Sequence, residues 1–496
     1  MIYRLKNFAN APLRRFTRAK NFLMCRSASG RVLRYPFRAM KSHRTSAPLS
    51  RVLALLFAAV FFTAFQVVAQ EQQQTPLLVI ISVDGMRPDY VTGADAHGAK
   101  IPHLRRFMRE GSYAEGVVGV VPTVTYPSHT TLVTGVWPAK HGIFGNTTFD
   151  PLQKNYQGWY WYAEDIRVPT LWDAAAKAGR TTASVQWPVT VGAHITWNIP
   201  EFWRASTDDD AKLLRAVSTA GLVIDAEKEI GPYPGGIDPS IEADEQRGQY
   251  AQWILEKKRP ALLTLHLIAL DHIEHDTGPF SPEAIAILER LDTAIGNVCA
   301  TAELLSPGRA YVAVVSDHGF AKTDTQLNLF PLFRQAKLFT ADDKGKITNW
   351  RAMPWVNSAA AAIMLKNPAD TATLQQVREL LAKLAADPAN GIDRILDADE
   401  LHKAGGFSSA SFFVSPKSGW KMGSTLDGPV LSKTKPGGTH GELPDVPDLH
   451  AAFFLVGPGV PEAHSLGIID MRDVAPTLAH VVGLSLPSAD GKNLLP

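Results

Sequence analysis

The chain has 496 residues, 45% of them hydrophobic and 20% charged, values that are ordinary for a globular protein with a large buried core. The formal net charge of +2 hides an uneven distribution, because residues 1–70 contain 13 of the 50 basic residues and no Asp or Glu. The remaining residues hold 37 basic and 48 acidic side chains, a net charge of −11, which argues against a nucleic-acid-binding patch.

Residues 1–69 have the pattern of an export signal. A basic region precedes the apolar stretch Val52–Ala69, and a polar segment, residues 70–75, follows it. Cleavage is expected after Ala69, and a start at Met40 would give a signal of ordinary length. The alternative is an uncleaved single-span anchor, which would be the protein's only contact with a membrane. The pattern therefore predicts an exported protein, periplasmic or secreted, and leaves its oligomeric state open.

Two cysteines occur in the whole sequence. Cys25 precedes the expected cleavage point, so only Cys299 would remain after export and no intramolecular disulfide could form. Cys299 lies in the apolar helical pattern of residues 285–305, which predicts a buried, unreactive thiol.

Strand-like runs alternate with helical patterns along most of the chain. In chain order these segments are 77–83, 102–110, 129–134, 170–178, 182–187, 261–270, 281–305, 310–316, 371–386, 451–456 and 472–483. The alternation predicts a three-layer α/β fold, an αβα sandwich with a mostly parallel central sheet. Residues 188–250 and 320–439 interrupt the pattern, so we expect residues 70–496 to form a single catalytic domain with insertions in these two places over the carboxyl edge of the sheet.

Acids and histidines stand at or near the ends of the apolar runs. They are Asp84, Asp271, His275, Asp317, His318 and His440. A lone strand-end Asp is often only a turn cap, and Asp271 with His275, four residues apart, could be a surface pair on one helical face. Together, however, these side chains can converge at the carboxyl edge of a parallel sheet. Carboxylates and neutral imidazoles suit zinc, so the set predicts a two-metal hydrolytic centre.

A threonine-rich segment, residues 122–135, follows a β-like run and opens a helical pattern. Thr125 is expected near the N-terminus of that helix, where backbone N–H groups favour anions. A hydroxyl there, placed on a metal, could attack phosphorus. An ordinary N-cap threonine is the competing interpretation. The other hydroxyls that could serve instead are Thr123, Ser128, Thr130 and Thr131.

Over residues 77–496 the sequence resembles the nucleotide pyrophosphatase/phosphodiesterase family of the alkaline phosphatase superfamily. The resemblance rests on six blocks in order, namely Val83-Asp-Gly-Met-Arg-Pro-Asp-Tyr90, Thr125-Tyr-Pro-Ser-His-Thr-Thr-Leu-Val-Thr-Gly135, His141-Gly-Ile-Phe-Gly-Asn146, Leu270-Asp-His-Ile-Glu-His275, Ser316-Asp-His-Gly319 and Gly438-Thr-His-Gly441. It implies an alkaline-phosphatase-like fold and hydrolysis of phosphodiester or pyrophosphate bonds in small nucleotide or lipid-derived substrates.

The resemblance also implies a role for each matching residue. Thr125 corresponds to a nucleophile that forms a covalent phospho-threonine. One zinc ion would be held by Asp84, Thr125, Asp317 and His318, and a second by Asp271, His275 and His440. Asn146 would contact a non-bridging phosphoryl oxygen, and its neutral amide suits the single charge of a diester. Manganese or iron could occupy the same residues.

Three alternatives remain beside this interpretation. A phosphomonoesterase of the same superfamily is the first, although residues 184–192 lack the Lys and Arg that some of these enzymes use. A sulfatase is disfavoured because Thr125 and His129 stand where sulfatases have Cys or Ser and Arg. A metal scaffold that binds without hydrolysis is the third.

Tyr126, which departs from the family's common Phe, is expected to line the pocket and could stack on a base or a choline head. Trp159, Trp161 and Trp187 are further aromatic candidates, each of which could equally be core or rim.

Overall fold

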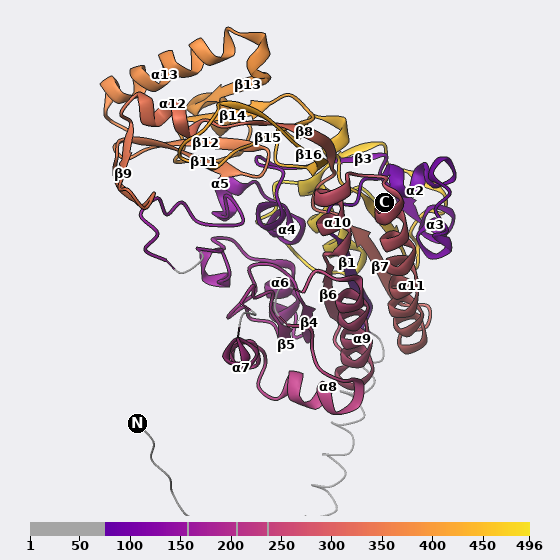
Figure 1. The fold of residues 1–496 in the computed structure, drawn as a ribbon. Coiled ribbons are helices and arrows are strands. Elements are labelled where there is room, and N and C mark those ends of the chain that lie inside the picture. The colour runs from indigo at the N-terminus through magenta and orange to yellow at the C-terminus, as the bar shows by residue number, and fades with distance from the viewer. Residues whose placement is uncertain (1–74, 156–157, 205–206, 236–237) are drawn as a thin grey trace, which may run out of the picture. The chain divides into compact units, whose positions relative to one another are not determined.

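An eight-stranded sheet forms the centre of the described part of the chain, residues 75–155, 158–204, 207–235 and 238–496 of this computed structural model (Figure 1). In spatial order its strands are β18 (His464–Ser465), β2 (Ser112–Tyr113), β17 (Phe453–Val456), β7 (Ala310–Val315), β1 (Leu77–Val83), β6 (Leu262–Leu267), β4 (Thr182–Val185) and β5 (Trp197–Ile199). Strand β17 runs antiparallel to β2 and β7, and the other neighbouring pairs are parallel.

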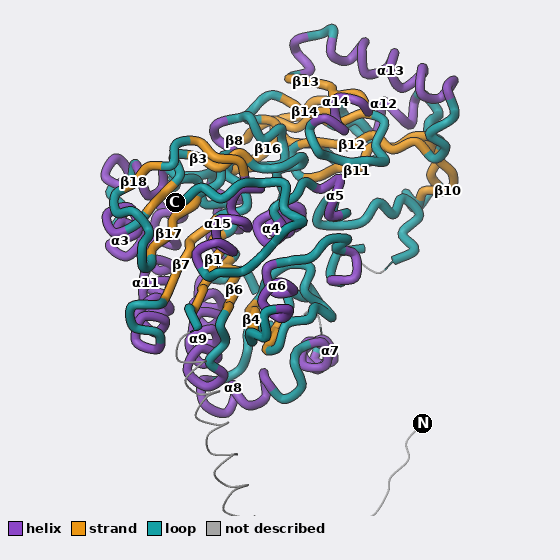
Figure 2. Tube along the Cα trace, turned by 180° about the vertical axis from the view of Figure 1, so that it is seen from behind, coloured by secondary structure: helices purple, strands orange, loops and turns teal. Residues whose placement is uncertain are grey.

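Helices cover both faces of this sheet (Figures 1 and 2). Successive side chains of a strand point to opposite faces, and all seven residues of β1 are buried. Leu77, Val79 and Ile81 belong to one apolar core, while Leu78 and Ile80 belong to another. The first core includes residues of α3 (Pro102–Glu110), α9 (Ile241–Lys258) and α11 (Pro282–Leu305), and the second includes residues of α4 (Thr125–Thr134), α6 (Leu171–Lys177) and α15 (Val474–Val481). The predicted three-layer α/β sandwich with a mostly parallel sheet is confirmed.

The predicted segments coincide with observed elements to within a few residues at most ends. The segment 102–110 is α3, and 310–316 is β7 with one residue fewer. The helix predicted at 129–134 begins earlier, at Thr125. Cys299 is buried in α11, and burial raises the pKa of its thiol to about 12, as expected for an unreactive cysteine.

Residues 188–250 contribute to the sandwich itself as well as to its surroundings. They contain the edge strand β5 and the first part of the face-covering helix α9, which continues to Lys258, in addition to α7 (Asp208–Val217) and α8 (Leu222–Ile230). The remaining short elements near the sheet are α2 (Asp89–Thr92), α5 (Pro138–His141), α10 (Ala269–Thr277) and the parallel pair β3 (Gly116–Val118) and β19 (Ile468–Asp470).

Residues 320–439 build two smaller sheets and a pair of strands beside them, with an apolar core of their own. The four-stranded sheet has the order β11 (Ala352–Asn357), β12 (Ala360–Leu365), β14 (Phe412–Pro416) and β13 (Ile392–Asp397). The helices of this region are α12 (Phe330–Gln335), α13 (Thr371–Ala385) and α14 (Ala398–Lys403). The separate strand pair consists of β9 (Phe339–Ala341) and β10 (Ile347–Trp350). The three-stranded sheet consists of β15 (Trp420–Met422), β8 (Ala321–Leu327) and β16 (Leu431–Thr439).

The pairing of β8 with β16 returns the chain to the sheet edge from which it departed. The two strands are antiparallel, and Thr439 lies opposite Ala321. Residues just before β8 and just after β16 are therefore neighbours although more than 100 positions separate them. This register places His440 beside His318, and their rings stack with centroids 3.6 Å apart.

The predicted export signal at residues 1–69, together with Cys25, lies outside the described residues and stays a prediction. In the part of the chain that the structure describes, we find no helix with the length and apolarity needed to cross a membrane.

Candidate active site

The predicted site residues gather at the carboxyl ends of three neighbouring parallel strands. Asp84 follows β1 directly, and Asp317 lies two residues after β7. Strand β6 ends at Leu267, and the short helix α10 that begins at Ala269 carries Asp271. Because β1 pairs with both β6 and β7 in parallel register, these three connections meet at one edge of the sheet.

The start of α10 is held by Asp244 of α9. Its Oδ2 accepts hydrogen bonds from the backbone N–H groups of Ile268 at 2.8 Å and Ala269 at 2.7 Å. Its Oδ1 accepts from the Arg247 guanidinium at 2.6 Å, and both side chains of this ion pair are fully buried. Asp244 thus satisfies first-turn amide groups of the helix that presents two of the predicted metal-binding residues.

Replacing Asp244 with alanine is expected to lower the free energy of unfolding by about 3–5 kcal/mol, because Arg247 would remain buried without its carboxylate. Urea denaturation followed by circular dichroism measures the change. The control is Asp225→Ala, which removes a solvent-exposed pair with Lys228 and should leave the unfolding midpoint in place. Equal midpoints for both variants would contradict the role assigned to Asp244.

One group of predicted ligands consists of Asp84, Asp317 and His318. Donor atoms of these three side chains lie within 4.8 Å of one another, and all three residues are buried. His318 Nε2 is 3.4 Å from Asp84 Oδ1 and 3.2 Å from Asp317 Oδ2. The other oxygen of Asp317 accepts from the backbone N–H of Gly85 at 3.2 Å. Gly85 has φ +75°, so the turn that aims this N–H favours glycine.

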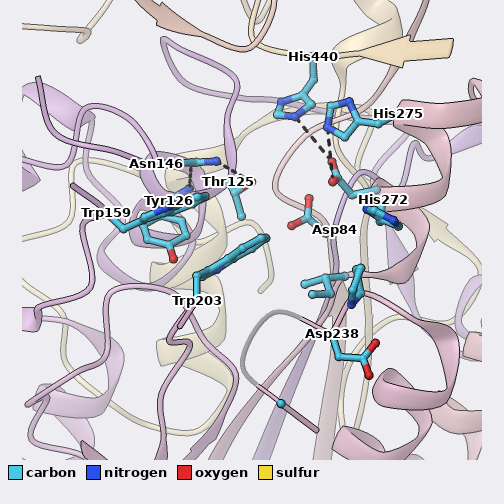
Figure 3. A pocket seen from close by; sticks show the side chains of 14 residues that line it. Asp84, Thr125, Tyr126, Asn146, Trp159, Trp203, Asp238, His272, His275 and His440 are labelled. Carbon is cyan, nitrogen blue, oxygen red and sulfur yellow. Dashed lines mark hydrogen bonds and ion pairs between the residues drawn. The ribbon is translucent and has the colours of Figure 1, made fainter. Parts of the chain in front are cut away.

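The second group consists of Asp271 with the imidazoles of His275 and His440, which lie next to each other (Figure 3). Asp271 Oδ2 lies 3.5 Å from His275 Nε2, and Oδ1 lies 3.6 Å from His440 Nε2. Asp271 and His275 are one helical turn apart on α10, as their spacing predicted. His318 also approaches this group, since donor atoms of Asp271, His318 and His440 lie within 4.8 Å of one another.

Each of these imidazoles is anchored through its Nδ1 by a backbone carbonyl. The acceptors are Gly319 O at 3.0 Å for His318, Gly438 O at 3.3 Å for His275 and Thr123 O at 2.9 Å for His440. A carbonyl can only accept, so Nδ1 carries the ring hydrogen and a neutral ring has its lone pair on Nε2. Burial, His318 and His275 hold the pKa of His440 well below its usual range, which keeps that ring neutral.

When the imidazoles are neutral and the carboxylates are ionised, lone pairs of nitrogen therefore face carboxylate oxygens in both groups. Four side-chain atoms of these two groups are buried and have no hydrogen-bond partner among the described residues, namely Asp84 Oδ1, Asp271 Oδ1, Asp317 Oδ2 and His318 Nε2. Burial and the carboxylates of Asp317 and Asp271 raise the pKa of Asp84 well above its usual range. A divalent cation would satisfy the lone pairs and offset the repulsion between the acids, so the residues fit metal ions well.

Thr125 lies beside these groups as the first residue of α4 and lines the cavity (Figure 3). The N-cap position belongs to Val124, and no side chain caps the helix, which removes the interpretation of Thr125 as an ordinary N-cap. Most competing hydroxyls are bonded elsewhere: Thr123 donates to Glu442 O, Thr130 to Tyr126 O and Thr131 to Val136 O. Ser128 is fully buried and does not line the cavity.

Asn146 is oriented toward Thr125 by a backbone contact. Its Oδ1 accepts from the N–H of Tyr126 at 2.9 Å, which assigns the two ends of the amide. Its Nδ2 therefore faces Thr125, with Oγ1 of that residue 3.4 Å away. A donor in this position can contact an oxygen of a group bound to Thr125.

An aromatic wall borders the cavity, which has a volume of about 580 Å³ (Figure 3). The rings of Trp159 and Trp203 stack with centroids 4.8 Å apart, and Tyr126 lies 5.4 Å from Trp159. The full lining set is Asp84, Thr125, Tyr126, Asn146, Trp159, Trp203, Gly235, Asp238, Pro239, Ile268, Asp271, His272, His275 and His440. Lys and Arg are missing from this set of described residues, so its protein groups supply no permanent cation.

Sequence reasoning missed Trp203 and the buried side chains of His266 and Glu201, and it assigned no contact to the buried His129. His266 in β6 contacts Asp84 through Nε2 and Glu201 through Nδ1. Burial alone would lower the pKa of His266, but the hydrogen bonds to Asp84 and Glu201 raise it well above its usual range. His129 contacts the Thr125 carbonyl, and burial lowers its pKa to about 3. The only sign of His266 in the sequence was a polar residue inside the apolar strand pattern of residues 262–267. That sign does not show which side chains His266 contacts.

The other aromatic and polar candidates have different surroundings. Trp161 and Trp187 are buried in the apolar cores, whereas Trp159 lines the cavity. His272, on the turn of α10 between Asp271 and His275, also lines the cavity. Glu274 of the same helix is fully buried and accepts a hydrogen bond from the Tyr90 hydroxyl at 2.6 Å.

The chain is similar to several known proteins. The family described as type I phosphodiesterase / nucleotide pyrophosphatase matches residues 78–442. The chain is 22% identical over 446 residues to the bis(5'-adenosyl)-triphosphatase ENPP4 of Pongo abelii, covering 88% of this chain and 84% of the relative. It is 24% identical over 457 residues to human ectonucleotide pyrophosphatase/phosphodiesterase family member 5, covering 89% and 80%.

A solved structure has the same fold. An inactive variant of murine ectonucleotide pyrophosphatase/phosphodiesterase 5, in complex with AMP, matches with a TM-score of 0.60 and 21% identity. The match covers 85% of this chain and 97% of the murine chain. The alkaline-phosphatase-like architecture implied by the sequence motifs is thereby supported by structure as well.

Proposed function

Because this chain belongs to the type I phosphodiesterase / nucleotide pyrophosphatase family, we propose that it is a two-metal hydrolase that cleaves phosphoric diesters or nucleotide pyrophosphates through a phospho-threonine at Thr125. One observation carries the proposal. Two groups of carboxylates and anchored imidazoles, with lone pairs facing one another, lie at a cavity edge beside the Thr125 hydroxyl. The family relationship supports hydrolysis of phosphodiester or pyrophosphate bonds.

In this proposal Asp84, Thr125, Asp317 and His318 would hold one zinc ion, and Asp271, His275 and His440 would hold the other. His318 is assigned to the first group because its Nε2 lies within 3.4 Å of both Asp84 and Asp317. When bound, two such cations lower the pKa of a hydroxyl and stabilise the charge on the leaving oxygen. The same donors also accept manganese or iron, so zinc is the choice that the Asp and His composition favours.

The chain's own groups then account for the chemistry. Oγ1 of Thr125 gives up its proton and forms a bond to phosphorus while the bond to the leaving alcohol or phosphate breaks, and the leaving oxygen takes up a proton. Asn146 donates from Nδ2 to a non-bridging oxygen. Water next attacks phosphorus, the bond to Thr125 breaks and the threonine regains its hydrogen. The positive end of the α4 helix dipole also favours the anionic phosphoryl group throughout.

The aromatic wall supports a substrate with a flat or cationic group beside the phosphoryl position. Tyr126, Trp159 and Trp203 can stack on a nucleobase, and the relatives' names, which refer to nucleotides and to AMP, favour nucleotides over lipid-derived diesters. The relatives are named as ectoenzymes, which agrees with the proposal that this protein is exported and acts in the periplasm or outside the cell.

The preference between diesters and monoesters tests the proposal. A diester has one negative charge at phosphorus, and the described cavity lining offers a neutral amide but no Lys or Arg for a second charge. The zinc-loaded protein should therefore have a much higher kcat/KM for bis-p-nitrophenyl phosphate or the p-nitrophenyl ester of thymidine 5′-monophosphate than for p-nitrophenyl phosphate. A preference for the monoester would support the phosphomonoesterase alternative, and inactivity on all three would support a binding protein.

Asn146→Ala should reduce kcat for the diester by about 10²–10³-fold, as is typical when one donor to a developing negative charge is lost. Steady-state kinetics on the same p-nitrophenyl diesters measure the effect. Asn155→Ala is a suitable control, since Asn155 has an exposed side chain outside the cavity. An Asn146→Ala enzyme with wild-type kinetics would remove this residue from the proposed mechanism.

A further inference from the structure

A continuous chain of buried contacts links the aromatic wall of the cavity to Asp84. The indole N–H of Trp203 donates to Glu201 Oε1. Glu201 Oε2 contacts His266 Nδ1 at 2.8 Å, and His266 Nε2 contacts Asp84 Oδ2 at 3.0 Å. Glu201 and His266 are fully buried, and neither lines the cavity, so they cannot touch a substrate directly.

This series of hydrogen bonds determines the orientation of the Asp84 carboxylate. His266 lies in β6 directly opposite Ser82 of β1, so two hydrogen-bonded central strands fix the imidazole relative to the end of β1. With Oδ2 of Asp84 bonded to His266, Oδ1 faces His318 at 3.4 Å and has no hydrogen-bond partner among the described residues. One carboxylate oxygen is thus anchored, and the other is directed to the position proposed for the metal.

Glu201 acts on two parts of the site at once. It contacts the imidazole that orients Asp84. It also accepts a hydrogen bond from the indole N–H of Trp203, which lies two residues further along the chain. Both Trp203 and Asp84 line the cavity (Figure 3). A single buried carboxylate therefore holds the metal-binding side and the aromatic side of the cavity in a common arrangement.

We propose that His266 and Glu201 are positioning residues, which hold Asp84 in the orientation that binds metal and hold Trp203 in the substrate-binding wall. The inference rests on the proposed function, because it assigns a purpose to a contact with a predicted ligand. Hydrogen-bond partners of metal-binding carboxylates commonly change metal affinity or activity by 10–100-fold when they are removed.

Two conservative variants separate the contact to Asp84 from general packing. The amide nitrogen of glutamine can reach the position of the imidazole Nε2, so His266→Gln retains a donor to Asp84. Asparagine is shorter, and its amide can reach only the position of Nδ1, so His266→Asn retains the contact to Glu201 and loses the one to Asp84. Both variants leave a polar side chain in the same buried place.

Zinc affinity, measured by competition with a chromophoric chelator, should be within about threefold of wild type for His266→Gln and about 10–100-fold weaker for His266→Asn. Circular dichroism confirms that each variant is folded. Equal affinities for the two variants, whether both retained or both reduced, would overturn the positioning role.

Glu201→Ala and Trp203→Phe provide an independent second test. Loss of Glu201 should weaken zinc binding and raise KM for a p-nitrophenyl diester, whereas Trp203→Phe should raise KM and leave zinc affinity unchanged. Glu201→Ala with wild-type zinc affinity would overturn the inference.

The wild-type protein separates this inference from the proposed function. Wild type that binds zinc and cleaves the diester supports the proposed function, and the variants then test the inference alone. Wild type that binds no zinc or cleaves no diester contradicts the proposed function and with it the basis of the positioning role.

Discussion

Thr125→Ala is expected to reduce turnover of a phosphodiester by on the order of 10⁴-fold or more, the scale seen when an enzyme loses its nucleophile. The hydroxyl of Thr125 lies at the first position of α4, lines the cavity and faces the Asn146 amide. Thr130 and Thr131 of the same helix donate to backbone carbonyls, and Ser128 is buried and does not line the cavity. Among the described Ser and Thr residues of this segment, Thr125 alone lines the cavity, so the others are not placed to take over the attack on phosphorus.

Zinc content should stay close to normal in Thr125→Ala, because Asp84, Asp317 and His318 remain as donors in the same group. Kinetics on bis-p-nitrophenyl phosphate and mass-spectrometric metal analysis of the same preparation measure both quantities. Ser128→Ala is the matched control: its hydroxyl is buried outside the cavity and has no hydrogen-bond partner among the described residues, so activity and stability should be unchanged. Substantial activity in a zinc-replete Thr125→Ala protein would reject Thr125 as the nucleophile.

The fold could be predicted from the sequence because its strands are buried on both faces. All residues of β1 and β6 are buried, which produces continuous apolar runs that stand out from the helical patterns between them. Asp84 and Asp317 then follow from where such runs end. These positions depend on local sequence and on one general property of parallel sheets, namely that their carboxyl ends share an edge.

Contacts between distant segments could not be predicted in the same way. Glu201 reaches His266 across 65 positions, and nothing in either local pattern indicates the partner. Trp203 resembles any aromatic residue of a polar loop until its stacking on Trp159 is known. Residues 188–250 were expected to be an insertion over the sheet edge, yet they include β5 and the first part of α9. The expectation missed these elements because the polar surface residues of this region obscure the buried face of α9. Long-range packing decides such features, and periodicity does not report it.

Metal removal should have an effect comparable to the loss of Thr125. Treatment with EDTA is expected to lower kcat by on the order of 10³-fold or more, since metal ions in such sites contribute several kcal/mol of charge stabilisation. Added zinc should restore activity. Bound metal should also raise the melting temperature, because Asp84 Oδ1, Asp271 Oδ1 and His318 Nε2, which have no hydrogen-bond partner in the described part of the chain, are brought together to bind it only in the folded state. Activity that persists after complete removal of metal would contradict a metal-dependent mechanism.

The His440→Ala variant tests metal binding at a single residue, whose position depends on the pairing of two strands that are far apart in the sequence. The register of β16 on β8 brings His440 to Asp271, and the Thr123 carbonyl fixes its Nδ1 so that Nε2 faces the carboxylate. Without this imidazole, Asp271 and His275 alone remain in the second group, so metal analysis should find a loss of up to one zinc per chain. His194→Ala, which removes an exposed imidazole, should bind as much zinc as wild type. If His440→Ala retained two tightly bound zinc ions, the assignment of His440 as a metal ligand would be wrong, and its contacts with the Thr123 carbonyl and the His318 ring would be structural.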